Sequence, residues 1–129
     1  MEFRHEVKHL INPSDRIALR QRLRAVMQPD PHAIDGRYKI RSLYFDTPED
    51  RALWEKLDGV NNREKFRIRY YNGDLSFICL EKKSKRSNLG NKDGATLSPE
   101  EAQAIVDGRI GWMIDSEKKV FWDVFGFLF

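Results

Sequence analysis

The chain has very little cysteine. Cys79 is the single one among 129 residues, so no disulfide can form within the chain. It lies in an apolar run, and we interpret it as a small buried hydrophobic residue rather than a nucleophile. The first residues contain no apolar signal-peptide core, and no apolar run approaches the ~20 residues of a membrane-spanning helix. These features favour a soluble protein in a reducing compartment, and we expect a cytoplasmic location.

Neither sign of charge dominates the sequence. Lysine and arginine together number 23, and aspartate and glutamate number 20, which gives a formal net charge of +3 and a pI of about 9.1. This mild basic excess is compatible with an anionic partner but does not require one. The length predicts one domain at most.

The C-terminal stretch VFWDVFGFLF, residues 120–129, is almost entirely apolar. Only Asp123 and Gly126 interrupt it. An exposed apolar patch of this kind normally marks an interface. We therefore expect either that the chain ends before the fold does, or that something outside the chain covers this end.

Alternation and turn residues predict four strands, at residues 3–11, 38–45, 63–71 and 75–83. Three helices are expected where a capping residue precedes a proline in the first turn, at Asn12-Pro13, Thr47-Pro48 and Ser98-Pro99. Residues 110–113 and 118–125 also have a helical pattern, whereas residues 86–96 resemble a loop or a frayed strand. Asn72-Gly73-Asp74 is a hairpin signal between the last two strands. Direct pairing of neighbouring strands favours an antiparallel α+β fold over a parallel α/β fold.

The charged residues of the strands share parity, so each set lies on one face of its strand. They are Arg4, Glu6 and Lys8 in the first strand, Arg67 and Arg69 in the third, and Glu81 and Lys83 in the fourth. The simplest interpretation is a solvated outer face. We expect Phe66, with Tyr44, Phe45 and Trp54, to lie in the core instead.

Two features favour an anion-binding face. The planar forks of Arg67 and Arg69 suit phosphate oxygens. The run KKSKRSNLGNK, residues 82–92, adds five basic residues and no acid. If the sheet curls into a barrel, these faces line its interior, where the cations would repel one another unless an anion sat among them. Glu6 and Glu81 could then hold a divalent metal that bridges the anion.

Four ordered segments carry a resemblance to a known family. They are RHEVKHLI (4–11), RSLYFDTPEDRALWEKLDG (41–59), REKFRIRYYN (63–72) and LEKKSKRSNLGNKDGATLS (80–98). Together they resemble the VTC domain in its bacterial form, the polyphosphate polymerase domain of the triphosphate tunnel metalloenzyme superfamily. The resemblance implies an antiparallel tunnel of about eight strands with flanking helices. It also implies synthesis of polyphosphate from ATP with Mn²⁺ or Mg²⁺.

The resemblance also implies roles for individual residues. The expected phosphate-binding residues are Arg4, Lys8, Arg67, Arg69, Lys83 and Lys92. Of these, Lys8, Arg67, Arg69 and Lys83 are the expected catalytic residues, and Glu6 and Glu81 are the expected metal ligands. The superfamily has E-x-E-x-K on its first strand, whereas this chain has Arg4-x-Glu6-x-Lys8. That difference shifts the site from metal binding toward anion binding and argues against simple triphosphatase activity.

The family continues past the position that matches Phe129. We therefore expect residues 1–129 to be the N-terminal half of one VTC-like domain, truncated at its C-terminus. The full-length parent is then the active enzyme, and this chain alone is inactive. The expected partners are ATP and polyphosphate, or another triphosphate, and a membrane protein that receives the product.

Several alternatives stay open from the sequence. Glu6 and Glu81 could neutralise neighbouring cations instead of binding metal. We expect Lys82, Lys85 and Arg86 to be solvated surface. The function could be a non-catalytic module for polyphosphate, inositol phosphate or RNA, or a triphosphate hydrolase. No specific nucleic acid is expected, because no RNA-binding loop motif is present.

Overall fold

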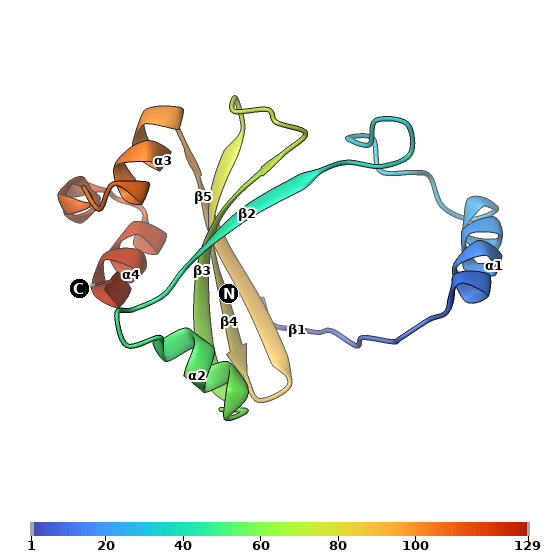
Figure 1. Cartoon of the computed structure of the whole chain (residues 1–129), viewed down its shortest axis with the longest axis horizontal. Helices are drawn as coiled ribbons and strands as arrows, with labels where there is room; N and C mark the ends of the chain where they lie inside the picture. The colour runs from blue at the N-terminus through green and yellow to red at the C-terminus, as the bar shows by residue number, and fades with distance from the viewer. Residues whose placement is uncertain (1, 129) are drawn as a thin grey trace. The chain divides into compact units, whose positions relative to one another are not determined.

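The computed structural model describes residues 2–128. The elements are, in order, β1 (Arg4–His5), α1 (Pro13–Arg24), β2 (Ile40–Phe45), α2 (Arg51–Leu57), β3 (Asn62–Tyr71), β4 (Ile78–Arg86), β5 (Leu89–Leu97), α3 (Pro99–Val106), the short 3₁₀ helix η1 (Gly111–Asp115) and α4 (Lys119–Leu128) (Figure 1). The chain divides into two compact units. The smaller one is Val7–Lys39, and the larger one holds the sheet and the remaining helices.

The larger unit is built on a five-stranded antiparallel sheet with the order β1-β5-β4-β3-β2. Among residues 2–128, β1 and β2 each pair on one side only, so the sheet is open rather than closed. An α+β fold with an incomplete antiparallel tunnel was predicted from the sequence, and this prediction is confirmed. The turn at Asn72-Gly73 also forms as expected, with φ angles of 54° and 69° and a 2.9 Å hydrogen bond from the Asp74 amide to the Tyr71 carbonyl.

Three strands differ from the prediction. β4 covers Ile78–Arg86 rather than residues 75–83. The first strand is only Arg4–His5, not residues 3–11, because pairing with β5 is confined to these two residues. Conversely, residues 89–97 form the full strand β5 rather than a loop. Gly90, Asn91 and Gly94 weaken its alternating pattern, but pairing with β4 from Ile78 to Arg86 gives its backbone groups partners.

The helix after β2 begins three residues later than its capping motif predicts. It starts at Arg51, because Asp50 has a left-handed φ of 55°. The side chain of Asp46 at the end of β2 then accepts hydrogen bonds from the amides of Ala52 and Leu53, at 2.8 and 3.1 Å. This aspartate replaces Thr47 as the main side-chain acceptor for the first turn of α2.

The core lies on one face of the sheet, beneath α3, η1 and α4 (Figure 1). Phe66, Leu80, Met113 and Val124 are its largest fully buried side chains. Phe66 confirms the prediction, and Phe45 packs at the edge of this core. Tyr44 and Trp54 do not belong to it, since their exposed fractions are 50% and 56%.

The apolar C-terminal stretch contributes directly to this core. Val120, Phe121 and Val124 of α4 are buried against the sheet, whereas Trp122 is exposed. The same face also buries Lys82, whose ammonium lies 3.0 Å from Asp123 and 3.1 Å from Glu64. The solvated position expected for Lys82 is therefore wrong, because its strand parity places it under α4.

The smaller unit contains α1 and a tight bridge between Ile34 and Arg37. Asn12 caps α1 as predicted, in a reciprocal pair of hydrogen bonds with Asp15. No side chain of α1, which the structure describes in full, is buried. Within residues 2–128 no helix has both the length and the apolar character required to cross a membrane.

Candidate phosphate-binding face

The sheet face opposite α3, η1 and α4 carries most of the charged strand residues, and we call it the charged face. Strand register sorts its side chains into rows that run across neighbouring strands. Lys65 of β3 lies opposite Lys83 of β4, which lies opposite Lys92 of β5. We call these three residues the lysine row. Neighbouring strands are about 4.8 Å apart, so the row concentrates three cations over a short distance.

The next row crosses the sheet through Tyr44, Arg67, Glu81 and Gly94. Arg67 donates from Nε to Oε2 of Glu81 at 2.5 Å and from Nη1 to the hydroxyl of Tyr44 at 3.0 Å. Lys92 donates to the other oxygen of Glu81 at 3.1 Å. Arg67 and Glu81 are 7% and 5% exposed, so this row contains a buried and fully paired charge network.

Both members of the buried pair are ionised. Burial by itself raises the pKa of Glu81, but hydrogen bonds and positive charge from Arg67 and Lys92 bring that pKa below its ordinary value. Burial by itself lowers the pKa of Arg67, but Tyr44 and Glu81 raise it above its ordinary value. The network thus compensates the cost of burying the charges.

Arg69 lies one row further along β3, opposite Ser42 and Cys79. Its Nε donates to the Ser42 hydroxyl at 2.8 Å, and the rest of its guanidinium retains donors for a ligand. Cys79 is partly buried, but it lies on the charged face rather than in the apolar core. Burial and the nearby Glu81 raise the pKa of its thiol, so it is a poor nucleophile at neutral pH.

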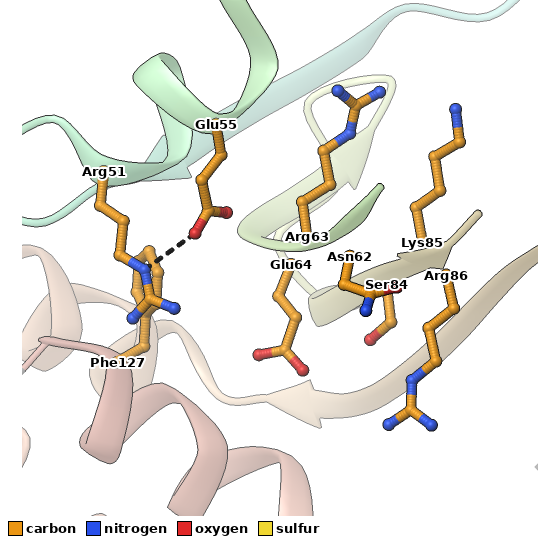
Figure 2. Close-up of a pocket in the computed structure, with 9 residues that line it drawn as sticks. All are labelled: Arg51, Glu55, Asn62, Arg63, Glu64, Ser84, Lys85, Arg86 and Phe127. Carbon is orange, nitrogen blue, oxygen red and sulfur yellow. Dashed lines mark hydrogen bonds and ion pairs between the residues drawn. The ribbon is translucent and has the colours of Figure 1, made fainter. Parts of the chain in front are cut away.

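The charged face continues to the opposite end of the strands. Arg63 pairs in register with Lys85, and Lys85 with Gly90, whose other partner is Arg4. A pocket of about 410 Å³ lies at this end. Figure 2 shows Arg63 and Lys85 extending to one side of the strands, and Glu64 and Arg86 extending to the other. The same pocket includes the Arg51–Glu55 ion pair of α2, at 3.0 Å.

The structure brings together most of the residues predicted for the site. Arg67, Arg69, Lys83 and Lys92 share the charged face with Glu81. Glu6 approaches it as well, with a carboxylate oxygen 3.9 Å from the ammonium of Lys83. Arg4 occupies the β1 edge of the same face, opposite Gly90. Lys8 belongs to the smaller unit, so its predicted place among these residues stays a prediction.

The predicted metal site would use the carboxylates of Glu6 and Glu81. Among residues 2–128, no group of three His, Cys, Asp or Glu side chains could hold a metal ion. Both oxygens of Glu81 accept hydrogen bonds from Arg67 and Lys92. Glu81 therefore does not fit a preformed metal site, and its contacts favour the neutralising role that the sequence left open. Binding of Mn²⁺ or Mg²⁺ at Glu6 and Glu81 stays a prediction.

Sequence reasoning missed two residues of this face. Lys65 shares parity with Arg67 and Arg69 and could have been found by the same argument. Tyr44 was assigned to the core, although half of its surface is exposed and its hydroxyl contacts Arg67. Its place depends on the register between β2 and β3, and no short turn joins these strands to reveal that register.

An open antiparallel sheet with α3, η1 and α4 on one face and cationic rows on the other defines an α+β domain. The model of the VTC domain family matches residues 3–125. The chain therefore belongs to the VTC domain family, whose domain is associated with polyphosphate polymerases. No curated protein and no solved structure matches the chain at a significant level.

The family match confirms the resemblance seen in the sequence. It covers nearly the whole chain, and it lends no support to the expectation that the chain is only the N-terminal half of the domain. That the protein is of the bacterial form stays a prediction.

Proposed function

We propose that this protein is a phosphotransferase that lengthens polyphosphate from ATP, with the phosphate chain lying along the charged face. One observation carries the proposal. Lys65, Lys83 and Lys92 form a row on three neighbouring strands, and Arg69 lies two rows away on the same face. A concentration of cations opposite a helix-covered core favours a polyanionic ligand, which relieves their mutual repulsion.

The charged residues of this face are of two kinds, a buried pair and a set of more accessible cations. Arg67 and Glu81 form the buried pair, and Arg67 donates to Glu81 and to Tyr44 rather than to a ligand. Lys83 and Lys92 are more accessible, with side chains 33% and 44% exposed. The phosphate oxygens are therefore bound by the lysine row and Arg69, while Arg67 keeps the middle of the sheet in place.

In the proposed reaction, a terminal oxygen of the phosphate chain attacks the γ-phosphorus of ATP. The bond between that phosphorus and the β–γ bridging oxygen breaks, and ADP leaves with the electron pair. Such a transfer needs positioning and neutralisation of charge more than covalent help from the protein. The lysine row supplies this charge next to the reacting phosphates. Mn²⁺ or Mg²⁺ would supply further neutralisation of charge.

We place this reaction in the cytoplasm, where the reduced state of Cys79 is maintained. Transfer of the product to a membrane-protein partner is a further part of the proposal. No residue of the charged face is assigned to that step.

The test compares two arginines on opposite faces of the sheet. Arg69 lies on the charged face, whereas Arg41 of β2 pairs with Tyr70 and has the opposite parity. Polyphosphate affinity and polymer synthesis from ATP and Mn²⁺ are both measured on this protein. Arg69→Ala should weaken binding by about tenfold or more, since a hydrogen bond to a charged group contributes ~1.5–3 kcal/mol.

Arg41→Ala should leave both quantities near the wild-type values. Equal binding by the two variants would contradict the proposal. If the protein binds polyphosphate but makes none, the non-catalytic module is favoured. If it releases orthophosphate from triphosphates instead, the hydrolase is favoured.

A further inference from the structure

Tyr44 is the exposed polar side chain in the middle row of the charged face. The other members of that row offer a ligand little: Arg67 and Glu81 are buried, and Gly94 has no side chain. Tyr44 in contrast is 50% exposed. A phosphate chain crossing from the lysine row toward Arg69 passes this row and meets Tyr44 there.

The hydroxyl of Tyr44 is oriented by its contact with Arg67. Its oxygen accepts a hydrogen bond from Nη1 of Arg67 at 3.0 Å. A phenolic oxygen that accepts in this way still has its own hydrogen to donate. Among residues 2–128, no side chain or backbone group accepts that hydrogen. The ion pair of Arg67 with Glu81 fixes the guanidinium, and thereby the direction of the hydroxyl.

Positive charge surrounds this hydroxyl. The ammonium of Lys65 lies 5.5 Å from the centre of the Tyr44 ring, and the guanidinium carbon of Arg67 lies 5.8 Å from it. The hydrogen bond from Arg67, together with the charges of Arg67, Lys65 and Arg69, lowers the pKa of Tyr44, although burial opposes this effect. A more acidic phenol is a stronger hydrogen-bond donor, and an anion is the acceptor that these cations attract.

We propose that Tyr44 is a further phosphate-binding residue, whose hydroxyl donates a hydrogen bond to an oxygen of the phosphate chain between the lysine row and Arg69. This inference rests on the proposed function, because it names a contact within the same site. In this proposal the neutral hydroxyl of Tyr44 contacts the phosphate chain in the middle row, and the lysine row and Arg69 contact it on either side.

The competing interpretation is that Tyr44 only supports Arg67. Tyr44→Phe separates the two, since it removes the hydroxyl and retains the ring next to Lys65. A supporting role predicts a lower melting temperature with little change in affinity. A phosphate contact predicts a loss of affinity whose pH dependence differs from that of the wild type.

The experiment measures the binding of linear tripolyphosphate to the 129-residue chain by calorimetry at fixed salt concentration. We expect Tyr44→Phe to weaken binding about five- to tenfold, as for loss of one hydrogen bond to a charged group. Tyr70→Phe is the matched control, since Tyr70 lies on the opposite face beside the core and should bind like the wild type. Lys83→Met is the positive control for the site and should lose affinity.

The second readout is the pH profile. As pH rises toward the lowered pKa of Tyr44, a phenolate forms and repels phosphate, so wild-type affinity should fall. The charged groups facing Tyr44 are Lys65, Arg67 and Arg69 of β3, with Glu81 behind Arg67. Tyr44→Phe retains all of them, so the part of the alkaline loss that disappears in this variant belongs to Tyr44.

Each outcome decides one question. Weaker binding together with a reduced alkaline loss supports the phosphate contact. If Tyr44→Phe binds like the wild type while Lys83→Met does not, the role of Tyr44 is refuted and the proposed function stands. A weaker affinity with an unchanged pH profile also refutes the contact, because the predicted contribution of the Tyr44 hydroxyl to the pH dependence is then missing. If the wild type itself does not bind tripolyphosphate, the proposed function on which this inference rests is refuted.

Discussion

Glu81→Gln tests the buried charge pair at the centre of the sheet. The variant keeps the shape of the side chain and removes its charge, which leaves the guanidinium of Arg67 buried without a counter-ion. Both side chains are almost fully buried, with 9% and 7% of their surface exposed. Removing one partner of such a pair costs about 3–5 kcal/mol. The retained amide oxygen can still accept one hydrogen bond, so we expect the lower end of this range.

A loss of about 3 kcal/mol in the free energy of unfolding should lower the melting temperature by roughly 10 °C for a chain of this size. The assay is chemical unfolding at neutral pH, with circular dichroism as the signal. Glu55→Gln is the control. Glu55 pairs with Arg51 at the surface, and the Arg51 side chain is 64% exposed. A surface pair in a helix contributes about 0.3–0.5 kcal/mol, so the control should remain close to the wild type.

The difference between Glu81→Gln and the wild type should depend on pH. The pKa of Glu81 is lower in the folded protein than the ordinary value of 4.5. Its contribution to stability is therefore complete above about pH 4.5 and is lost as pH falls through the lowered folded pKa. The reasoning is refuted if Glu81→Gln and Glu55→Gln cost the same at neutral pH, or if the cost of Glu81→Gln grows in acid.

Two further predictions concern the helix-covered face. Phe66→Ala should lower the free energy of unfolding by about 3–5 kcal/mol, because Phe66 is fully buried and its ring centroid lies 4.8 Å from that of Phe127. Urea unfolding measures this cost, and a cost below about 1 kcal/mol would contradict the packing. Asp123→Asn should cost about 2 kcal/mol in the same assay, because the nearly buried Lys82 is left with Glu64 as its one charged partner. A neutral result for Asp123→Asn would show that α4 does not need this ion pair.

Parity within each strand could be predicted from the sequence, and it correctly separated the charged face from the core for β3. In β4 it placed Glu81 and Lys83 together, but Lys82 lies under α4 and Cys79 lies on the charged face, against expectation. Register could not be predicted. The turn at Asn72-Gly73 pairs Tyr71 with Asp74, and if this pairing continued, Arg67 would lie opposite Ile78. In the structure the segment from Leu75 to Phe77 extends the loop, with Asp74 accepting from the amide and hydroxyl of Ser76. Arg67 therefore lies opposite Glu81.

Long-range pairing explains the other differences. The lysine row depends on β5, a strand whose glycines and polar residues weaken its own pattern. The hydroxyl of Tyr44 meets Arg67 only because β2 joins the sheet beside β3 after an intervening helix. Such contacts arise from packing between segments far apart in the chain, which local propensity does not reveal.

The most direct test of the charged face is a lysine protection experiment on the unmodified protein. The chain is acetylated briefly with and without polyphosphate, and mass spectrometry gives the extent of modification at each lysine. We expect polyphosphate to protect Lys65, Lys83 and Lys92, and to leave Lys56 of α2 and Lys119 of α4 as reactive as before. Protection confined to the helices, or equal protection at all five lysines, would contradict the assignment of the charged face as the phosphate-binding site.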